Sequence, residues 1–86
     1  MTGAYRLEIQ RRALKELGKL DAQVRRRISA AIDQLAGDPR PSGCKKLVGR
    51  DAWRIRVGDH RVIYEIEDDV VLVRVVRVAH RREVYE

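Results

Sequence analysis

The segment from Trp53 to Ile66 constrains the fold more than any other part of the chain. It contains two runs of alternating residues around Gly58-Asp59, a dipeptide typical of the two-residue turn of a β-hairpin. A two-residue loop fixes the strand register and places Arg56 opposite Arg61. Side chains alternate between the faces of a strand, so one hairpin face is apolar. It carries Trp53, Ile55, Val57, Val62, Tyr64 and Ile66.

The other face of this hairpin is basic, because Arg54, Arg56 and Arg61 share it. Like charges directly opposite each other are destabilising, so three guanidinium groups on a rigid sheet indicate a bound anion. Phosphate fits best, because the guanidinium fork matches its oxygens. The simpler interpretation is a solvated sheet face whose charge is neutralised by acids such as Glu65 and Glu67. The hairpin alone does not decide between these two interpretations.

The N-terminal half predicts one strand and two helices. Alternation from Tyr5 to Ile9 is typical of a strand with one buried face. Two apolar stripes at helical spacing follow: Ala13, Leu14, Leu17 and Leu20, then Val24, Ile28, Ala31, Ile32 and Leu35. Gly18 and Asp21 come in the right order for a helix end and a new N-cap, which favours a helical hairpin. One long kinked helix is the alternative, since the stripe continues in phase through Gly18.

The rest of the chain completes a small sheet. Residues 37–43 are rich in Gly and Pro and predict a loop, with a short strand possible at 45–48. Residues 70–79 are apolar on both faces, which indicates a central strand. We expect a single α+β domain over residues 1–86 in the order β-α-α-β-β-β. The helical hairpin packs on one face of a mainly antiparallel sheet, with Trp53 among the main core side chains.

Composition excludes several classes of protein. The chain has 86 residues, of which 44% are hydrophobic and 37% charged, which is typical of a compact globular domain. The single cysteine, Cys44, cannot form an internal disulfide, and no Cys or His has metal-ligand spacing, so we expect no metal and no cofactor. The charged N-terminus does not fit a signal peptide, and the longest aliphatic run is too short to span a bilayer. A soluble, cytoplasmic protein without a membrane partner is expected.

The basic residues indicate an acidic partner. The net charge is +6, from 19 basic and 13 acidic residues, and 15 of the bases are arginine. Arginine favours directional contacts to phosphate or carboxylate, so RNA, DNA and an acidic protein are all candidates. Two further clusters flank the hairpin: Lys45-Lys46 before it and His80-Arg81-Arg82 after the last strand. Arg25-Arg26-Arg27 is better interpreted as a solvated helix face, because consecutive helical residues point in different directions.

The end of the last strand carries the residue types that acid–base chemistry needs. If this strand pairs with the hairpin, its end brings His80, Arg81 and Tyr85 near the arginine face. The strand is apolar on both sides, so the sequence leaves open whether His80 or Arg81 points to that face.

Five motifs occur together in this chain: Y-R-L-E-I-Q-R-R-A-L-K-E-L, L-x-x-D-P-R-P, K-K-L-x-G, W-R-I-R-V-G-D-H-R-V-I-Y-E-I and H-R-R-E-V-Y. Their order and spacing resemble the RelE/ParE toxin superfamily from Tyr5 to Tyr85. The resemblance implies a toxin of a type II toxin–antitoxin pair, neutralised by a cognate antitoxin protein. RelE-like members cut mRNA on the ribosome without a metal, and the substrate's 2′-hydroxyl attacks the adjacent phosphate.

The same resemblance assigns expected roles to residues. Arg54 and Arg56 fall at the paired basic positions before the turn, and Arg61 lies within G-D-H-R-V-I-Y. Arg81 and Tyr85 take the C-terminal catalytic positions, His80 is a further catalytic candidate, and RNA contacts are expected from Lys45, Lys46 and Arg82.

The general base is the point where this chain departs from the RelE pattern. RelE-like enzymes can carry a lysine in the hairpin pair as the base, whereas this chain has Arg54 and Arg56. A guanidinium stays protonated at working pH and does not readily act as a base. Tyr85, His80 and Glu83 remain as alternatives for the role.

Two other functions are compatible with parts of this sequence. A ParE-like inhibitor of DNA gyrase shares the fold and needs no nuclease site; the segment H-R-R-E-V-Y favours the nuclease over it. A non-enzymatic basic nucleic-acid-binding domain is the third possibility. The aromatic content of 5% disfavours that reading, because single-strand binders use exposed stacking platforms.

Overall fold

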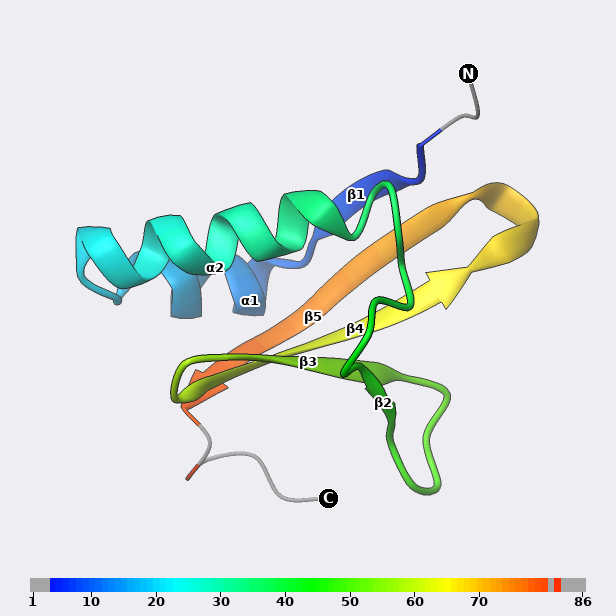
Figure 1. The fold of residues 1–86 in the computed structure, drawn as a ribbon. Coiled ribbons are helices and arrows are strands. Elements are labelled where there is room, and N and C mark those ends of the chain that lie inside the picture. Colours follow the sequence, from blue (N-terminus) through cyan, green and yellow to red (C-terminus); the bar gives the residue numbers. More distant parts are fainter. Residues whose placement is uncertain (1–3, 81, 83–86) are drawn as a thin grey trace.

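The computed structural model describes residues 4–80 and 82 as two helices on one face of a five-stranded sheet (Figure 1). The sheet order is β1-β5-β4-β3-β2; the β1–β5 pair is parallel and the other pairs are antiparallel. The α+β prediction is confirmed, and the short strand after the loop is present with only two residues. The elements are β1 (Arg6–Ile9), α1 (Arg11–Gly18), α2 (Ala22–Gln34), β2 (Lys45–Lys46), β3 (Trp53–Val57), β4 (His60–Glu67), the 3-10 turn η1 (Asp68–Val70) and β5 (Leu72–His80).

The helical half forms two separate helices. Helix α1 ends at Gly18, and the Asp21 carboxylate accepts hydrogen bonds from the backbone N–H groups of Gln23 and Val24, both at 3.0 Å. These bonds satisfy two donors that the first turn of α2 leaves unpaired. The predicted stop and start are therefore confirmed, and the single kinked helix is wrong. No helix within residues 4–80 and 82 is long and apolar enough to cross a membrane.

The hairpin has the predicted register. Val57 lies opposite His60, and Arg56 opposite Arg61. Gly58 begins the turn with φ of 59°, in the left-handed region that two-residue hairpin turns require. Strand β5 lies between β1 and β4 and has buried side chains on both faces, as expected for a central strand. A register shift between Ile63 and Tyr64, where β5 carries one extra residue, was not predicted.

The core lies between the helices and the sheet, but Trp53 is not one of its central side chains. Trp53 is only partly buried and packs at the rim, where the Arg40 guanidinium lies 5.1 Å from the ring centroid. The sequence interpretation overestimated this residue because alternation gives the face of a side chain but not its distance from the sheet edge. The main core comprises Ala13, Leu17, Ile28, Ile32, Leu35, Ile55, Val62, Tyr64, Val73, Val75 and Val78.

A second, smaller apolar cluster lies on the sheet face away from the helices. It consists of Leu47, Ala52, Ile63 and Ala79. Ile63 pairs with Arg54, and Ala79 pairs with Arg61, so the cluster shares its face with the hairpin arginines. The loop after β2 supplies the other two members, and its Leu47 N–H donates to the Ala52 carbonyl at 2.9 Å. A small apolar cluster therefore packs beside the arginines on the same face of the sheet, which the sequence did not predict.

The Tyr64 phenol makes stability pH-dependent in the alkaline range. Tyr64 is fully buried and its hydroxyl donates to the Pro39 carbonyl at 2.7 Å; burial, and then the nearby Cys44, raise its pKa. A raised native pKa stabilises the fold below the unfolded value of about 10, and this contribution is lost as pH rises further. We expect Tyr64→Phe to flatten the loss of stability above about pH 10, measured by urea titrations between about pH 9 and pH 12. An unchanged alkaline slope would show that Tyr64 does not cause it.

Candidate functional site

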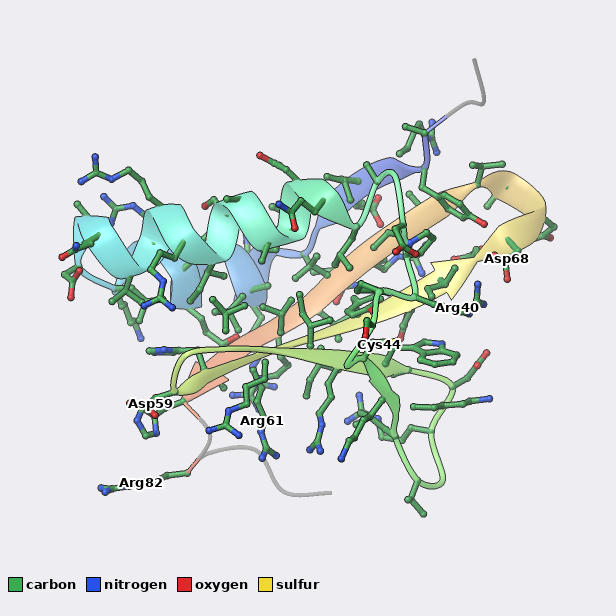
Figure 2. All side chains as sticks on the ribbon, viewed as in Figure 1. Arg40, Cys44, Asp59, Arg61, Asp68 and Arg82 are labelled. Atoms are coloured by element: carbon green, nitrogen blue, oxygen red, sulfur yellow. The ribbon has the colours of Figure 1, made fainter. Side chains whose placement is uncertain are left out.

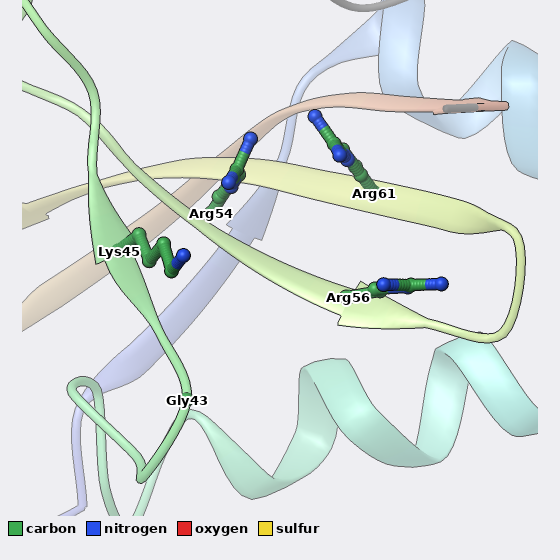
Figure 3. A pocket seen from close by; sticks show the side chains of 5 residues that line it. All are labelled: Gly43, Lys45, Arg54, Arg56 and Arg61. Atoms are coloured by element: carbon green, nitrogen blue, oxygen red, sulfur yellow. The ribbon is translucent and has the colours of Figure 1, made fainter. Parts of the chain in front are cut away.

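A pocket of about 250 Å³ opens on the sheet face away from the helices (Figure 3). Lys45, Arg54, Arg56 and Arg61 line it together with Gly43, so every side chain beyond glycine is cationic. In Figure 2 the labelled Arg61 extends from the hairpin on the side opposite α2. The pocket brings together four of the residues that the sequence predicted for catalysis or RNA binding. We call it the arginine pocket.

Three neighbouring strands position these cations. Arg54 and Arg56 lie on β3 and Arg61 on β4, while Lys45 on β2 pairs directly with Arg54. Paired residues in a sheet project to the same face, so the strand register alone directs the four side chains to one side. The Arg56 Nε also donates to the Gly58 carbonyl at 3.2 Å, which holds this guanidinium close to the hairpin turn.

The electrostatics of the arginine pocket favour an anion. Burial, and then the charges of Arg61 and Arg56, lower the pKa of the Arg54 guanidinium below its ordinary value. Such crowding of like charges is unfavourable, and an anion bound among them would relieve it. None of the described lining residues is acidic. Four cations around one pocket could thus accept an anion such as a phosphate group.

Two of the carboxylates that the solvated-face interpretation named, Glu65 and Glu67, contact a different arginine. Arg74 on β5 binds Glu65 at 3.0 Å and Glu67 at 2.7 Å, and a third ion pair joins it to Glu8 at 2.7 Å. These contacts raise the pKa of Arg74. Glu65 and Glu67 thus balance a different arginine, farther along the sheet than the pocket. The sequence interpretation missed Arg74 because neighbours on adjacent strands are distant in sequence.

Two of the predicted RNA-contact residues lie outside the arginine pocket. Lys46 pairs with Trp53 on β3, so it projects to the other face, and its ammonium lies 3.8 Å from the Asp51 carboxylate. Arg82 is exposed, and its backbone N–H donates to His80 Nδ1 at 3.2 Å. Neither side chain lines the pocket.

The strand register settles the direction of His80. Ala79 pairs with Arg61 and shares the face of the arginine pocket, so His80, the next residue, falls on the helix face. There its ring lies 5.5 Å from that of His60, edge to face, and both histidines line a separate pocket beside Glu16 and Lys19. The structure therefore does not bring His80 to the arginine face. Arg81, Tyr85 and Glu83 lie outside the described residues.

Within residues 4–80 and 82, no three His, Cys, Asp or Glu side chains are grouped so as to hold a metal ion.

Comparison with known proteins identifies the family. The sequence model for the ParE toxin of type II toxin–antitoxin systems matches residues 7–85, nearly the whole chain. The chain belongs to the RelE/ParE toxin superfamily. The mRNA interferase toxin RelE of Escherichia coli K12 is 33% identical to this RelE/ParE protein over 86 residues, covering 95% of this chain and 90% of the relative. A RelE toxin of Methanocaldococcus jannaschii is 30% identical over 78 residues, covering 85% and 86%.

Solved RelE structures share the fold of this RelE-like toxin. The archaeal RelE–RelB complex from Pyrococcus horikoshii superposes with a TM-score of 0.83 at 29% identity, covering 94% of this chain and 99% of that chain. The intact E. coli RelBE toxin–antitoxin complex superposes with a TM-score of 0.79 at 32% identity, covering 90% of this chain and 96% of that chain. The resemblance stated from the motifs is confirmed. The protein is a RelE-like toxin of the type II toxin–antitoxin class.

Proposed function

We propose that this RelE-like toxin is an endoribonuclease that cleaves mRNA on the ribosome, with the arginine pocket holding the scissile phosphate. The observation that carries the proposal is the convergence of four cationic side chains, Lys45, Arg54, Arg56 and Arg61, on one pocket. The E. coli relative named an mRNA interferase supports the same reaction.

The chemistry that we propose needs positioning and charge rather than a protein nucleophile. The RNA 2′-oxygen forms a bond to the adjacent phosphorus, and the bond from phosphorus to the 5′-oxygen breaks. The 2′-proton passes to a base, the leaving 5′-oxygen takes up a proton, and the products end in a 2′,3′-cyclic phosphate and a 5′-hydroxyl. Negative charge grows on the non-bridging oxygens, where preorganised guanidinium groups stabilise it.

The proton transfers are assigned to the C-terminal segment. Arg54 and Arg56 remain protonated at neutral pH, because even a lowered guanidinium pKa stays far above it. The position of His80 on the helix face favours Tyr85 over it as the base, with Glu83 as the remaining candidate. In this proposal Arg81 completes the phosphate clamp, while Lys46 and Arg82 contact RNA beyond the pocket.

We infer two partners besides mRNA, the ribosome and a cognate antitoxin protein. Catalysis on the ribosome implies that the toxin acts in the cytoplasm. The relatives from P. horikoshii and E. coli were solved in complex with RelB antitoxins, which supports a cognate antitoxin protein for this toxin. The net charge of +6 suits an acidic partner in either case.

Gyrase inhibition is the second candidate function, because the matching family model is that of ParE toxins. A ParE-like activity would inhibit DNA supercoiling by purified gyrase and leave mRNA intact. A non-enzymatic nucleic-acid binder would neither inhibit gyrase nor cleave mRNA, and its affinity would fall steeply with salt.

A single 2′-deoxy substitution in the mRNA tests the proposed reaction. Replacing the ribose whose 2′-hydroxyl attacks removes the nucleophile, so cleavage at that position should be abolished while cleavage at other codons continues. Gel analysis of end-labelled mRNA in a ribosome reaction measures both sites at once. Cleavage that persists at the deoxy position would contradict 2′-hydroxyl attack and require another nucleophile.

A further inference from the structure

One wall of the arginine pocket comes from a loop rather than from the hairpin. Gly43 lies in the connection between α2 and β2 and Lys45 is the first residue of β2, whereas the three arginines lie on β3 and β4. Strand β2 contributes only two residues to the sheet, so the ladder fixes this wall weakly. Gly43 has φ of 91°, a conformation open to glycine, where the loop approaches β2. The position of Lys45 therefore depends on what holds the loop.

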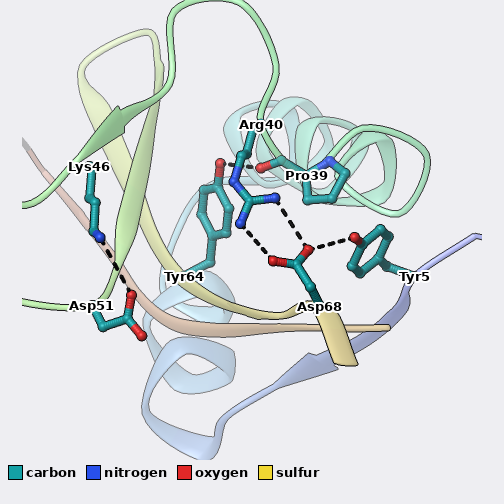
Figure 4. Close-up of polar contacts among 7 residues, drawn as sticks. All are labelled: Tyr5, Pro39, Arg40, Lys46, Asp51, Tyr64 and Asp68. Carbon is teal, nitrogen blue, oxygen red and sulfur yellow. Dashed lines mark hydrogen bonds and ion pairs between the residues drawn. The ribbon is translucent and has the colours of Figure 1, made fainter. Parts of the chain in front are cut away.

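An ion pair with Asp68, the first residue of η1, holds that loop (Figure 4). The Arg40 guanidinium binds the Asp68 carboxylate through two bonds, Nη2 to Oδ2 at 2.9 Å and Nη1 to Oδ1 at 3.3 Å. The Tyr5 hydroxyl donates to the same carboxylate at 2.7 Å, and the Arg40 guanidinium also lies over the Trp53 ring. The loop residue Arg40 thus contacts η1 through Asp68 and β3 through Trp53, and Tyr5, just before β1, supports Asp68.

The geometry of this contact matters more than its strength. The Arg40 and Asp68 side chains are 43% and 56% exposed, so the pair adds little to global stability. A bidentate guanidinium–carboxylate contact nevertheless fixes orientation, and the Trp53 ring restricts Arg40 from another side. Hydrogen bonds from Arg40 and then Tyr5 lower the pKa of Asp68, so the carboxylate is charged at neutral pH. Removing the pair should therefore free the loop without unfolding the domain.

We propose that Asp68 is a positioning residue for the arginine pocket: through Arg40 it seats the loop so that Lys45 faces Arg54 and supplies the fourth cation to a bound phosphate. This inference rests on the phosphate-binding role proposed for that pocket. Asp68 itself touches neither substrate nor reacting atoms. Because its effect passes through Lys45, the loss of Asp68 should weaken anion binding only when Lys45 is present. This non-additivity is the signature of the positioning role.

A double-mutant cycle on pyrophosphate binding tests this signature. Inorganic pyrophosphate is titrated calorimetrically into the full-length toxin and its Asp68→Ala, Lys45→Ala and doubly substituted variants. Asp68→Ala should weaken binding about tenfold, the loss of one charge-assisted contact. In the Lys45→Ala background the same substitution should change affinity less than about twofold, because the cation that it positions is gone. A merely structural role would give additive losses instead.

Asp51→Ala is the matched control. Like Asp68→Ala, it removes an exposed carboxylate from an ion pair, but the partner of Asp51 is Lys46, which does not line the pocket. It should leave pyrophosphate affinity unchanged. If Asp68→Ala proves unstable, Arg40→Lys keeps the charge but not the bidentate contact, and a loss of about threefold is expected. Wild-type affinity in Asp68→Ala, additive losses, or no pyrophosphate binding by the unsubstituted toxin would each overturn the inference. Pyrophosphate binding with this signature but without mRNA cleavage would refute the nuclease and leave the positioning role standing.

Discussion

Arg61→Ala is expected to reduce ribosome-dependent mRNA cleavage by about 10²–10³-fold while the protein stays folded. Arg61 lies half-buried on β4, where it lines the arginine pocket opposite Arg56. Its guanidinium would stabilise charge that develops only in the transition state, so the loss should appear in the single-turnover rate. Rapid-quench cleavage at saturating ribosomes measures that rate directly.

Arg11→Ala is the control for Arg61→Ala. It removes the same charge from an exposed position at the start of α1, so it preserves any effect of net charge on ribosome encounter. Arg11→Ala should cleave at nearly the unsubstituted rate. Arg61→Lys keeps the charge but loses the bidentate guanidinium group, so its cleavage rate should lie between those of Arg61→Ala and Arg11→Ala. Loss of helical circular dichroism in Arg61→Ala would show that the arginine is structural, and an unchanged rate would remove it from the catalytic site.

Ile28→Ala is expected to cause the largest loss of stability, about 2–5 kcal/mol. Ile28 on α2 is 0% exposed and belongs to the main core between helix and sheet. Its truncation removes apolar burial and leaves a cavity that the flanking strands can only partly fill. Small domains are stable by only about 5–15 kcal/mol, so this loss is a large part of the total. Urea titration followed by circular dichroism measures it.

Leu14→Ala provides the comparison on the other helix. Leu14 is 56% exposed, so the same kind of truncation should change the free energy of unfolding by less than about 1 kcal/mol. Trp53→Ala should fall between these values, because Trp53 is partly buried at the rim. Equal losses for Ile28→Ala and Leu14→Ala would mean that α2 does not pack as described.

Local signals made most of the fold predictable. Gly58-Asp59 and strict alternation determine the hairpin register, and Gly18 with Asp21 separates the helices. The bulge in β5 had no such signal, because its extra residue, Val76, is one of several valines along the strand. Trp53 was placed on the correct face but too deep, since depth depends on how far the helices cover the sheet.

The arginine pocket was predictable for the same reason, because three of its cations follow from one hairpin register. The direction of His80 was not, since it depends on pairing between β4 and β5 across a bulge. The contact between Arg40 and Asp68 joins residues 28 positions apart, and nothing in either local sequence indicates it. Contacts made by long polar side chains between distant segments need the assembled fold.

Mapping of mRNA 5′ ends tests the central claim most directly. A translation reaction is run with and without the toxin and analysed by primer extension, and the same mRNA is incubated with the toxin in the absence of ribosomes. The account predicts new 5′ ends in register with codons, present only when ribosomes are included. Intact mRNA with unaffected translation would contradict the nuclease and direct attention to gyrase supercoiling.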